Sequence, residues 1–186
     1  MKFCVTIIVA LMSLSFPALA DESEHSAELL TLLSAIDTVP SAQDFHAVSL
    51  DPPLDLFFAA DDPDLDIYLR RRAASLLSLF YSPQSRSYLL MLTLHGPLRL
   101  RWIATYTYCR AWSNRTTSPV LSFARIMLES KEALIRDAVV RGLAYMNSSA
   151  ADALLSQQQL VEKDKGVLRA IQRIQTRRKR SDIPLR

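Results

Sequence analysis

The chain has 186 residues, enough for one domain, and its formal net charge of +3 is too small to indicate any class of partner. Three glycines interrupt a sequence rich in leucine and alanine, and strand-like alternation of polar and apolar residues is missing. This composition argues against a sheet protein and predicts an all-α fold.

The first residues have the features of a secretory signal peptide. Lys2 precedes an apolar run over residues 3–16, and Ala18-Leu19-Ala20 has the small-x-small pattern of a cleavage site. We therefore expect cleavage near Ala20-Asp21, removal of residues 1–20, and export of the protein to the periplasm or the medium. The alternative is an uncleaved membrane anchor, for which the apolar run is short, because spanning a bilayer takes about 20 residues.

Signal cleavage would also change the cysteine chemistry. Removal of Cys4 leaves Cys109 without a second cysteine, so a disulfide within the mature chain is excluded. We expect Cys109 to be a buried thiol that packs as a small apolar side chain. An intermolecular disulfide is the alternative.

Charge is distributed unevenly along the chain. Residues 21–69 contain twelve acidic residues and no lysine or arginine, whereas residues 70–186 contain 21 basic and seven acidic residues. Such a separation bears on association more than on fold. Either the acidic front folds against the basic body, or the basic part binds an anionic partner.

All predicted elements are helices. A first amphipathic helix over residues 25–37 lies in an acidic N-terminal segment, residues 21–53, which ends in a rigid break at Asp51-Pro52-Pro53. Residues 54–178 are expected to form four pairs of helices, and residues 179–186 a basic tail. The predicted pairs are 54–60 with 65–80, 84–94 with 97–112, 119–129 with 132–146, and 150–161 with 165–178.

Helix-starting signals lie between these pairs. Ser82, Ser118 and Ser149 are predicted N-caps, and the first two precede a proline. An acidic cluster is interpreted as a helix start rather than a calcium loop, because it lacks the glycine and the distal glutamate of an EF-hand. Its members are Asp61, Asp62, Asp64 and Asp66.

One pattern returns in each pair. An arginine follows a large aliphatic residue at Arg70, Arg101, Arg136 and Arg169, with spacings of 31, 35 and 33 residues. Self-similarity at this period is typical of stacked helical hairpins, which bury a continuous core only together. The residues expected to face that core are Leu69, Ala73, Leu76, Leu77, Leu100, Ala104, Tyr108, Ile135, Val139 and Leu143.

The runs LRRRAASLL and IRDAVVRGLA, in the first and third pairs, resemble second helices of the HEAT-repeat family, especially its short bacterial form. The resemblance covers about residues 54–178 and implies an α-solenoid, a HEAT-like or armadillo-type superhelix of about four hairpins preceded by an N-terminal helix. It also implies an aspartate six residues before each repeated arginine, and Asp64 alone fits. Arg101 and Arg136 are therefore candidates for binding, unless they serve neighbouring units.

Aromatic residues gather on the predicted helix 97–112. Trp102 and Tyr106 are four residues apart and share a helix face. In HEAT-like stacks the second helices line the concave side, which would place both rings beside three arginines, Arg71, Arg72 and Arg110. Trp, Tyr and Arg dominate binding surfaces, so we predict a binding hot spot there. Burial of both rings in the core is the alternative.

The C-terminal run Arg177-Arg178-Lys179-Arg180 has two interpretations. It is either a solvated end of the last helix or a contact for an anionic surface of lipid, polysaccharide or protein. Nucleic acid is not an expected partner, because the protein is predicted to be exported.

Signals for catalysis are weak. His95 and Cys109 could be drawn as base and nucleophile, but no spacing supports that pair, and the sequence predicts neither a metal site nor a cofactor. We predict a non-enzymatic interaction or scaffold module of the bacterial cell envelope that binds a protein partner. The alternatives are an inhibitor or immunity-type protein that blocks a secreted enzyme, and an enzyme or lyase accessory.

Overall fold

The structure, a computed structural model, describes residues 25–181, so the predicted signal peptide and residues 182–186 lie outside the described residues. Within this part the chain is all-helical, with ten α-helices, one short 3-10 helix and no strand. The helices are α1 Ala27–Ser34, α2 Ala42–Val48, α3 Pro52–Asp61, α4 Ile67–Leu76, α5 Pro83–His95, α6 Leu98–Trp112, α7 Thr117–Leu128, α8 Ala133–Leu143, α9 Ser149–Val161 and α10 Lys165–Ser181, and the 3-10 helix η1 is Leu77–Leu79.

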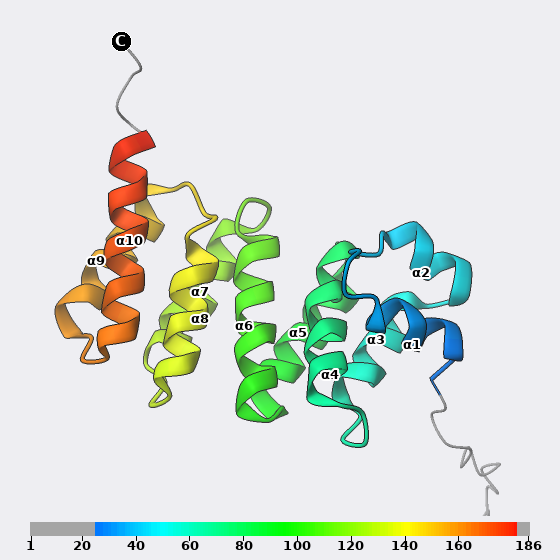
Figure 1. Cartoon of the computed structure of the whole chain (residues 1–186). Helices are drawn as coiled ribbons and strands as arrows, with labels where there is room; N and C mark the ends of the chain where they lie inside the picture. The colour runs from blue at the N-terminus through cyan, green and yellow to red at the C-terminus, as the bar shows by residue number, and fades with distance from the viewer. Residues whose placement is uncertain (1–24, 182–186) are drawn as a thin grey trace, which may run out of the picture.

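From α3 onward, consecutive helices pack in pairs. α3 contacts α4, α5 contacts α6, α7 contacts α8 and α9 contacts α10. The second helices of the pairs also contact one another in order, α4 with α6, α6 with α8 and α8 with α10, and Figure 1 shows them side by side. These four helices form one row, on which a site can be built from residues far apart in sequence.

The acidic front and the arginine-rich last helix lie at opposite ends of this row. α1 contacts α2 and α4, whereas α10 contacts α8 and α9. Figure 1 shows α1 and α2 at one end and α10 at the other. Within residues 25–181, the acidic front therefore packs on α4 and α5, where the basic part of the chain begins, and not on α10.

The N-terminal segment contains a helix that was not expected from the sequence. α2 begins with a capping box, in which the Ser41 hydroxyl accepts from the amide of Asp44 and the Asp44 carboxylate accepts from the amide of Ser41. Phe45 is fully buried and packs edge-on against Phe80 at a centroid distance of 6.1 Å. A helix of this length is stabilised by one anchored ring rather than by an apolar stripe, so periodicity does not reveal it.

The predicted break at Asp51-Pro52-Pro53 is a helix start instead. Asp51 is the N-cap of α3, with its carboxylate accepting from the amide of Leu54 at 3.3 Å, and the two prolines occupy the first helical positions. Proline fits there because the first turn has no intrahelical acceptor for its missing N–H. The prolines thus begin α3 rather than separating it from the segment before.

The other predicted caps differ in accuracy. Ser82 caps α5 as predicted, accepting from the amide of Ser85 at 3.0 Å. α7 begins after Thr116 rather than at Ser118, and the cap of α9 is Ser148, one residue before the predicted Ser149. Both observed caps lie one or two residues before the predicted ones. Several neighbouring hydroxyl residues could cap each helix, so the sequence does not decide between them.

The core lies where the helical period predicted it. Nine of the ten residues expected to face inward are buried, and Leu69 is partly buried against the core. The buried nine are Ala73, Leu76, Leu77, Leu100, Ala104, Tyr108, Ile135, Val139 and Leu143.

Three of the four repeated arginines link the two helices of their pair, whereas Nε of the fourth, Arg169, donates to the carbonyl oxygen of Lys165 within α10 at 3.1 Å. Nε of Arg70 donates to the carbonyl oxygen of Ala60, and Nε of Arg101 donates to that of Thr93, both at 3.0 Å. Both acceptors lie in the last turn of the preceding helix. Nη1 of Arg136 donates to the carbonyl oxygen of Ser130 at 2.8 Å, in the loop that follows α7. The carbonyls at the end of a helix have no intrahelical donor, so a guanidinium from the next helix satisfies them and complements the helix dipole.

Replacing Arg101 with glutamine is expected to lower the free energy of unfolding by about 1–2 kcal/mol, because a charged donor to Thr93 is lost. Urea denaturation followed by circular dichroism measures this. Arg99→Gln, an exposed change one residue from α6's N-terminus, is the control and should be nearly neutral. Equal effects of the two changes would contradict the capping role.

Arg136 also joins the third hairpin to the fourth. Its Nη2 and Nε donate to the two carboxylate oxygens of Glu162 at 2.7 and 2.8 Å. Glu162 accepts further hydrogen bonds from Nε2 of Gln158 and from the amides of Lys163 and Asp164, and its side chain is 1% exposed. The hydrogen bonds from Arg136 are the largest cause of a Glu162 pKa lowered from 4.5 to about 2, so the pair is ionised at neutral pH.

Candidate binding face

The second helices carry a surface rich in arginine and aromatic side chains. We call it the aromatic–arginine face and define it by Arg71 of α4, Trp102, Tyr106 and Arg110 of α6, Arg141 of α8 with Tyr145 just after it, and Arg173, Ile174 and Arg177 of α10. Four helices contribute to it, and the row of contacts between them places these side chains next to one another.

Trp102 and Tyr106 form the centre of the face. Their rings stack with an interplanar angle of 8° and a centroid distance of 5.9 Å, as their i,i+4 spacing allows. The guanidinium of Arg71 lies over the Trp102 ring, 5.7 Å from its centroid. Both rings are partly exposed, so they lie at the surface rather than in the core. The sequence-predicted residues Arg71, Trp102 and Tyr106 are therefore brought together.

Tyr145 is a member of the face that sequence reasoning missed. Its hydroxyl lies 3.4 Å from that of Tyr106, which is 39 residues away in the chain, and its side chain is 49% exposed. Arg110 lies over both rings, 5.0 Å from the Tyr145 centroid and 6.0 Å from the Tyr106 centroid. Burial raises the pKa of Tyr106, and the hydrogen bond with Tyr145 raises it further, so the phenol stays a neutral donor.

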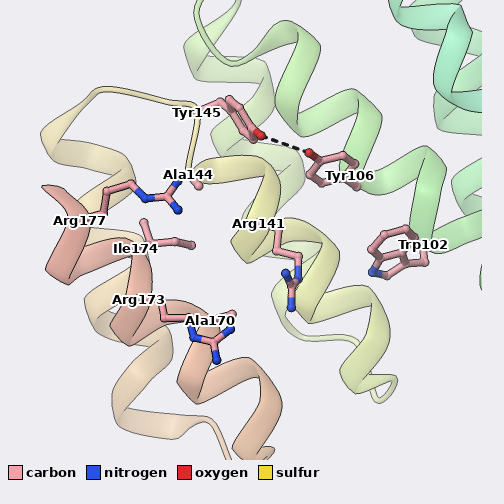
Figure 2. Close-up of a pocket in the computed structure, with 9 residues that line it drawn as sticks. All are labelled: Trp102, Tyr106, Arg141, Ala144, Tyr145, Ala170, Arg173, Ile174 and Arg177. Carbon is pink, nitrogen blue, oxygen red and sulfur yellow. Dashed lines mark hydrogen bonds between the residues drawn. The ribbon is translucent and has the colours of Figure 1, made fainter. Parts of the chain in front are cut away.

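Two hollows open on this face and share Trp102. The larger, of about 540 Å³, lies between α6, α8 and α10, and Figure 2 shows nine residues that line it. The smaller, of about 210 Å³, is lined by Arg71, Arg99, Trp102 and Leu134. Trp102 lines both hollows, and their lining residues together come from α4, α6, α8 and α10.

The larger hollow is strongly cationic at one side. Arg173 and Arg177 project from successive turns of α10, and Arg141 faces them from α8 (Figure 2). Arg141 donates to the Asp137 carboxylate at 2.7 Å, within its own helix. Arg173 has no hydrogen bond or ion pair with other residues of the described part. A guanidinium donates through a planar fork and accepts nothing, so this side fits carboxylate or phosphate groups.

Three predicted site residues are used by the fold instead. Arg101 donates to the carbonyl oxygen of Thr93 in the last turn of α5, and Arg136 to that of Ser130 in the loop after α7. Nη2 of Arg72 donates to the carbonyl oxygen of Thr38 at 2.8 Å, and its Nη1 donates to the Tyr68 hydroxyl at 3.1 Å. Arg72 thus ties the N-terminal segment to α4.

The predicted basic tail is largely part of α10, which continues to Ser181. Nη2 of Arg178 donates to the carbonyl oxygens of Leu143 and Met146 at 2.8 and 2.7 Å, and its Nη1 pairs with Asp152. Arg177 lines the larger hollow and Lys179 is exposed, whereas the side chain of Arg180 lies outside the described residues. Arg178 is therefore held by contacts within the fold, whereas the side chains of Arg177 and Lys179 lie at the surface.

Cys109 is the buried thiol that the sequence predicted. Its side chain is fully buried against α8, so it is inaccessible to another chain, and burial raises the pKa of the thiol. A neutral, enclosed thiol does not act as a nucleophile, so the pairing with His95 is not supported.

The acidic cluster makes local contacts. Asp66 caps α4 by accepting from the amide of Tyr68 at 2.7 Å, and Asp62 accepts from the amide of Asp64 and pairs with His25. Across residues 25–181, no group of three or more His, Cys, Asp or Glu side chains is arranged to hold a metal ion. In the same range, none of the helices combines the length and apolar character needed to cross a bilayer.

No known protein family, curated protein or solved structure matches this chain. The interpretation of the aromatic–arginine face therefore rests on its own geometry and chemistry.

Proposed function

We propose that this chain is a non-enzymatic protein-binding module whose aromatic–arginine face binds an acidic segment of a partner protein. The observation that carries this proposal is the gathering of Trp102, Tyr106 and Tyr145 with arginines from four helices on one face that has two hollows. Tryptophan, tyrosine and arginine supply most of the binding energy in protein interfaces.

The arrangement favours binding over catalysis. Stacked rings present a large apolar area that loses little conformational entropy on binding, because each ring is already held by a neighbour. The surrounding guanidiniums are donors without acid–base function near neutral pH. The chemistry therefore suits recognition of carboxylates and apolar side chains.

The fold and the cellular compartment of the module are the next part of the proposal. We infer a HEAT-like α-solenoid, which is supported by the order of helix contacts and by the repeated arginine that links the two helices in the first three pairs. The signal-like pattern of residues 1–20 supports export to the bacterial envelope, and a partner in that compartment.

Affinity capture from an envelope fraction tests the proposal. Trp102→Ala and Arg173→Ala should each reduce the recovered partner by about tenfold or more, as hot-spot truncations do. Arg125→Ala, which removes an exposed arginine of α7, is the control and should retain the partner. Partners recovered equally with all three variants would contradict the proposal.

A further inference from the structure

We infer that the smaller hollow holds the carboxyl-terminal residue of the partner segment, an assignment that rests on the function proposed above. The free α-carboxylate of that residue would lie between the guanidiniums of Arg71 and Arg99. Its apolar side chain would pack on Trp102 and Leu134, which complete the lining of the hollow. The protein would thus recognise the end of a chain, and not only an acidic stretch within one.

The two arginines of the smaller hollow lack a counter-charge. In the part of the chain that the structure describes, neither the Arg71 nor the Arg99 guanidinium makes a hydrogen bond or an ion pair. α4 and α6, which carry them, contain no acidic residue, and Asp137, the one acidic residue of α8, is paired with Arg141. The hollow therefore has two positive charges that no described residue neutralises.

Arg71 is held where binding of an anion is favourable. Its guanidinium lies 5.7 Å from the centroid of the Trp102 ring, and its Nε atom is buried without a hydrogen-bond partner. A cation that has lost part of its hydration and has gained no counter-charge is stabilised when an anion binds beside it. Stacking on the indole also restricts the guanidinium, so little side-chain entropy is lost when it donates to a carboxylate.

Two helix ends add positive potential to the same hollow. Arg99 and Leu134 are the second residues of α6 and α8, and neither helix has a side-chain cap at its N-terminus in the described residues. The first amides of a helix have no intrahelical acceptor and favour a negative charge nearby. An arginine at the second position opposes the helix dipole, so an external anion explains Arg99 better than the stability of α6 does.

Apolar surface beside the arginines favours a chain end over an acidic side chain. Trp102 is partly exposed and Leu134 is 39% exposed. The volume of about 210 Å³ is below that of sites for drug-sized ligands and suits a single residue. An Asp or Glu side chain carries its carboxylate on a short methylene stem, which covers little of this surface. A C-terminal residue carries a carboxylate and a whole apolar side chain on the same carbon atom.

Binding of short peptides to the whole chain, measured by fluorescence anisotropy, tests this inference. The probe is a fluorescein-labelled peptide that ends in leucine with a free carboxylate, and the matched control is the same peptide with a C-terminal amide. Because the two differ only in the charged group, we expect the amide to bind at least about tenfold more weakly. Equal affinities, or no binding of the free acid at about 1 mM, would overturn the inference.

Two substitutions locate the bound carboxylate. Arg99→Gln should weaken binding of the free acid by about tenfold and leave the amide unchanged, because it removes a charge and no apolar contact. Arg71→Lys should have a smaller effect, since the charge stays while the planar fork is lost. Arg125→Ala, an exposed change on α7, is the control and should have none. Free-acid binding that is indifferent to Arg99→Gln, in a variant shown to be folded by circular dichroism, would contradict the assignment.

Two further probes separate a chain end from other anions. A peptide with an internal glutamate and an amidated end offers an acidic side chain, and inorganic phosphate offers an anion without an apolar group. Each should displace the labelled free acid only at concentrations at least about tenfold above those of the unlabelled free acid. Displacement by either at equal or lower concentrations would overturn the assignment to a C-terminal residue.

The two proposals fail separately. If envelope capture depends on Trp102 and Arg173 but the free-acid and amide peptides bind equally, the protein-binding function stands and the C-terminal site is wrong. If the free-acid peptide binds through Arg99 but envelope capture is indifferent to Trp102 and Arg173, the C-terminal site stands and the proposed function is wrong.

Discussion

Gly142→Ala is expected to lower the free energy of unfolding by about 3 kcal/mol, an unusually large effect for one added methyl group. A Cβ atom at this position would lie 2.3 Å from Cβ of Cys109 and 3.2 Å from the carbonyl oxygen of Tyr106. Because both contacts are with α6, α6 and α8 would have to move apart. Alanine's better helix propensity, worth about 1 kcal/mol, offsets only part of this cost.

Urea denaturation of the variant and two controls measures the effect. Gly166→Ala, where the nearest atom to the new methyl group is a carboxylate oxygen of Asp164 at 3.0 Å, should be neutral or slightly stabilising. Cys109→Gly removes the clashing Cβ, so Gly142→Ala should cost at least about 1 kcal/mol less in that background. Additive effects at Cys109 and Gly142 would contradict the close-approach explanation.

Gly142 also affects the aromatic–arginine face. Gly142 packs against the backbone of Tyr106, and Tyr145 follows it by three residues. A forced separation of α6 and α8 would therefore lengthen the contact between the two tyrosine hydroxyls. The distance between α6 and α8 therefore affects both the packing of the core and the spacing of the aromatic rings.

Glu162→Gln is expected to lower the free energy of unfolding by about 3 kcal/mol, because it leaves the Arg136 guanidinium largely buried without its counter-charge. The Arg136 and Glu162 side chains are 14% and 1% exposed. Asp137→Asn, which removes the more exposed pair with Arg141 within one helix, is the control and should cost below about 1 kcal/mol. Equal losses in the free energy of unfolding would show that the pair between Arg136 and Glu162 stabilises the fold no more than the exposed pair does.

The same pair gives the protein a defined acid sensitivity. The pKa of Glu162 is lowered from 4.5 to about 2 in the folded chain, so the unfolded chain binds the proton first. Its stabilising contribution is therefore fully present above pH 4.5 and is lost as the pH falls from 4.5 towards 2. Unfolding curves at a series of pH values should show this loss in the native chain and a smaller one in Glu162→Gln.

Local features of the chain were determined by the sequence itself. The helical period predicted nine buried inward residues correctly, and Ser82 before a proline predicted the start of α5. The i,i+4 spacing of Trp102 and Tyr106 predicted their shared face. These predictions succeed because helix geometry fixes the direction of each side chain within one or two turns, whatever lies beyond.

The tertiary structure alone decided which residues meet across helices. Nothing in the sequence pairs Tyr106 with Tyr145 or Arg136 with Glu162. Nothing in it distinguishes Arg173, on the aromatic–arginine face, from Arg178, which donates to the carbonyl oxygen of Leu143 at the end of α8. Such contacts depend on how closely two helices approach, and packing between residues remote in sequence sets that distance. At Gly142, for example, the absence of a side chain lets α8 pack directly against Cys109 of α6. The sequence therefore supplied the candidate residues, but only the packing of α6, α8 and α10 decided which of them lie together on the aromatic–arginine face.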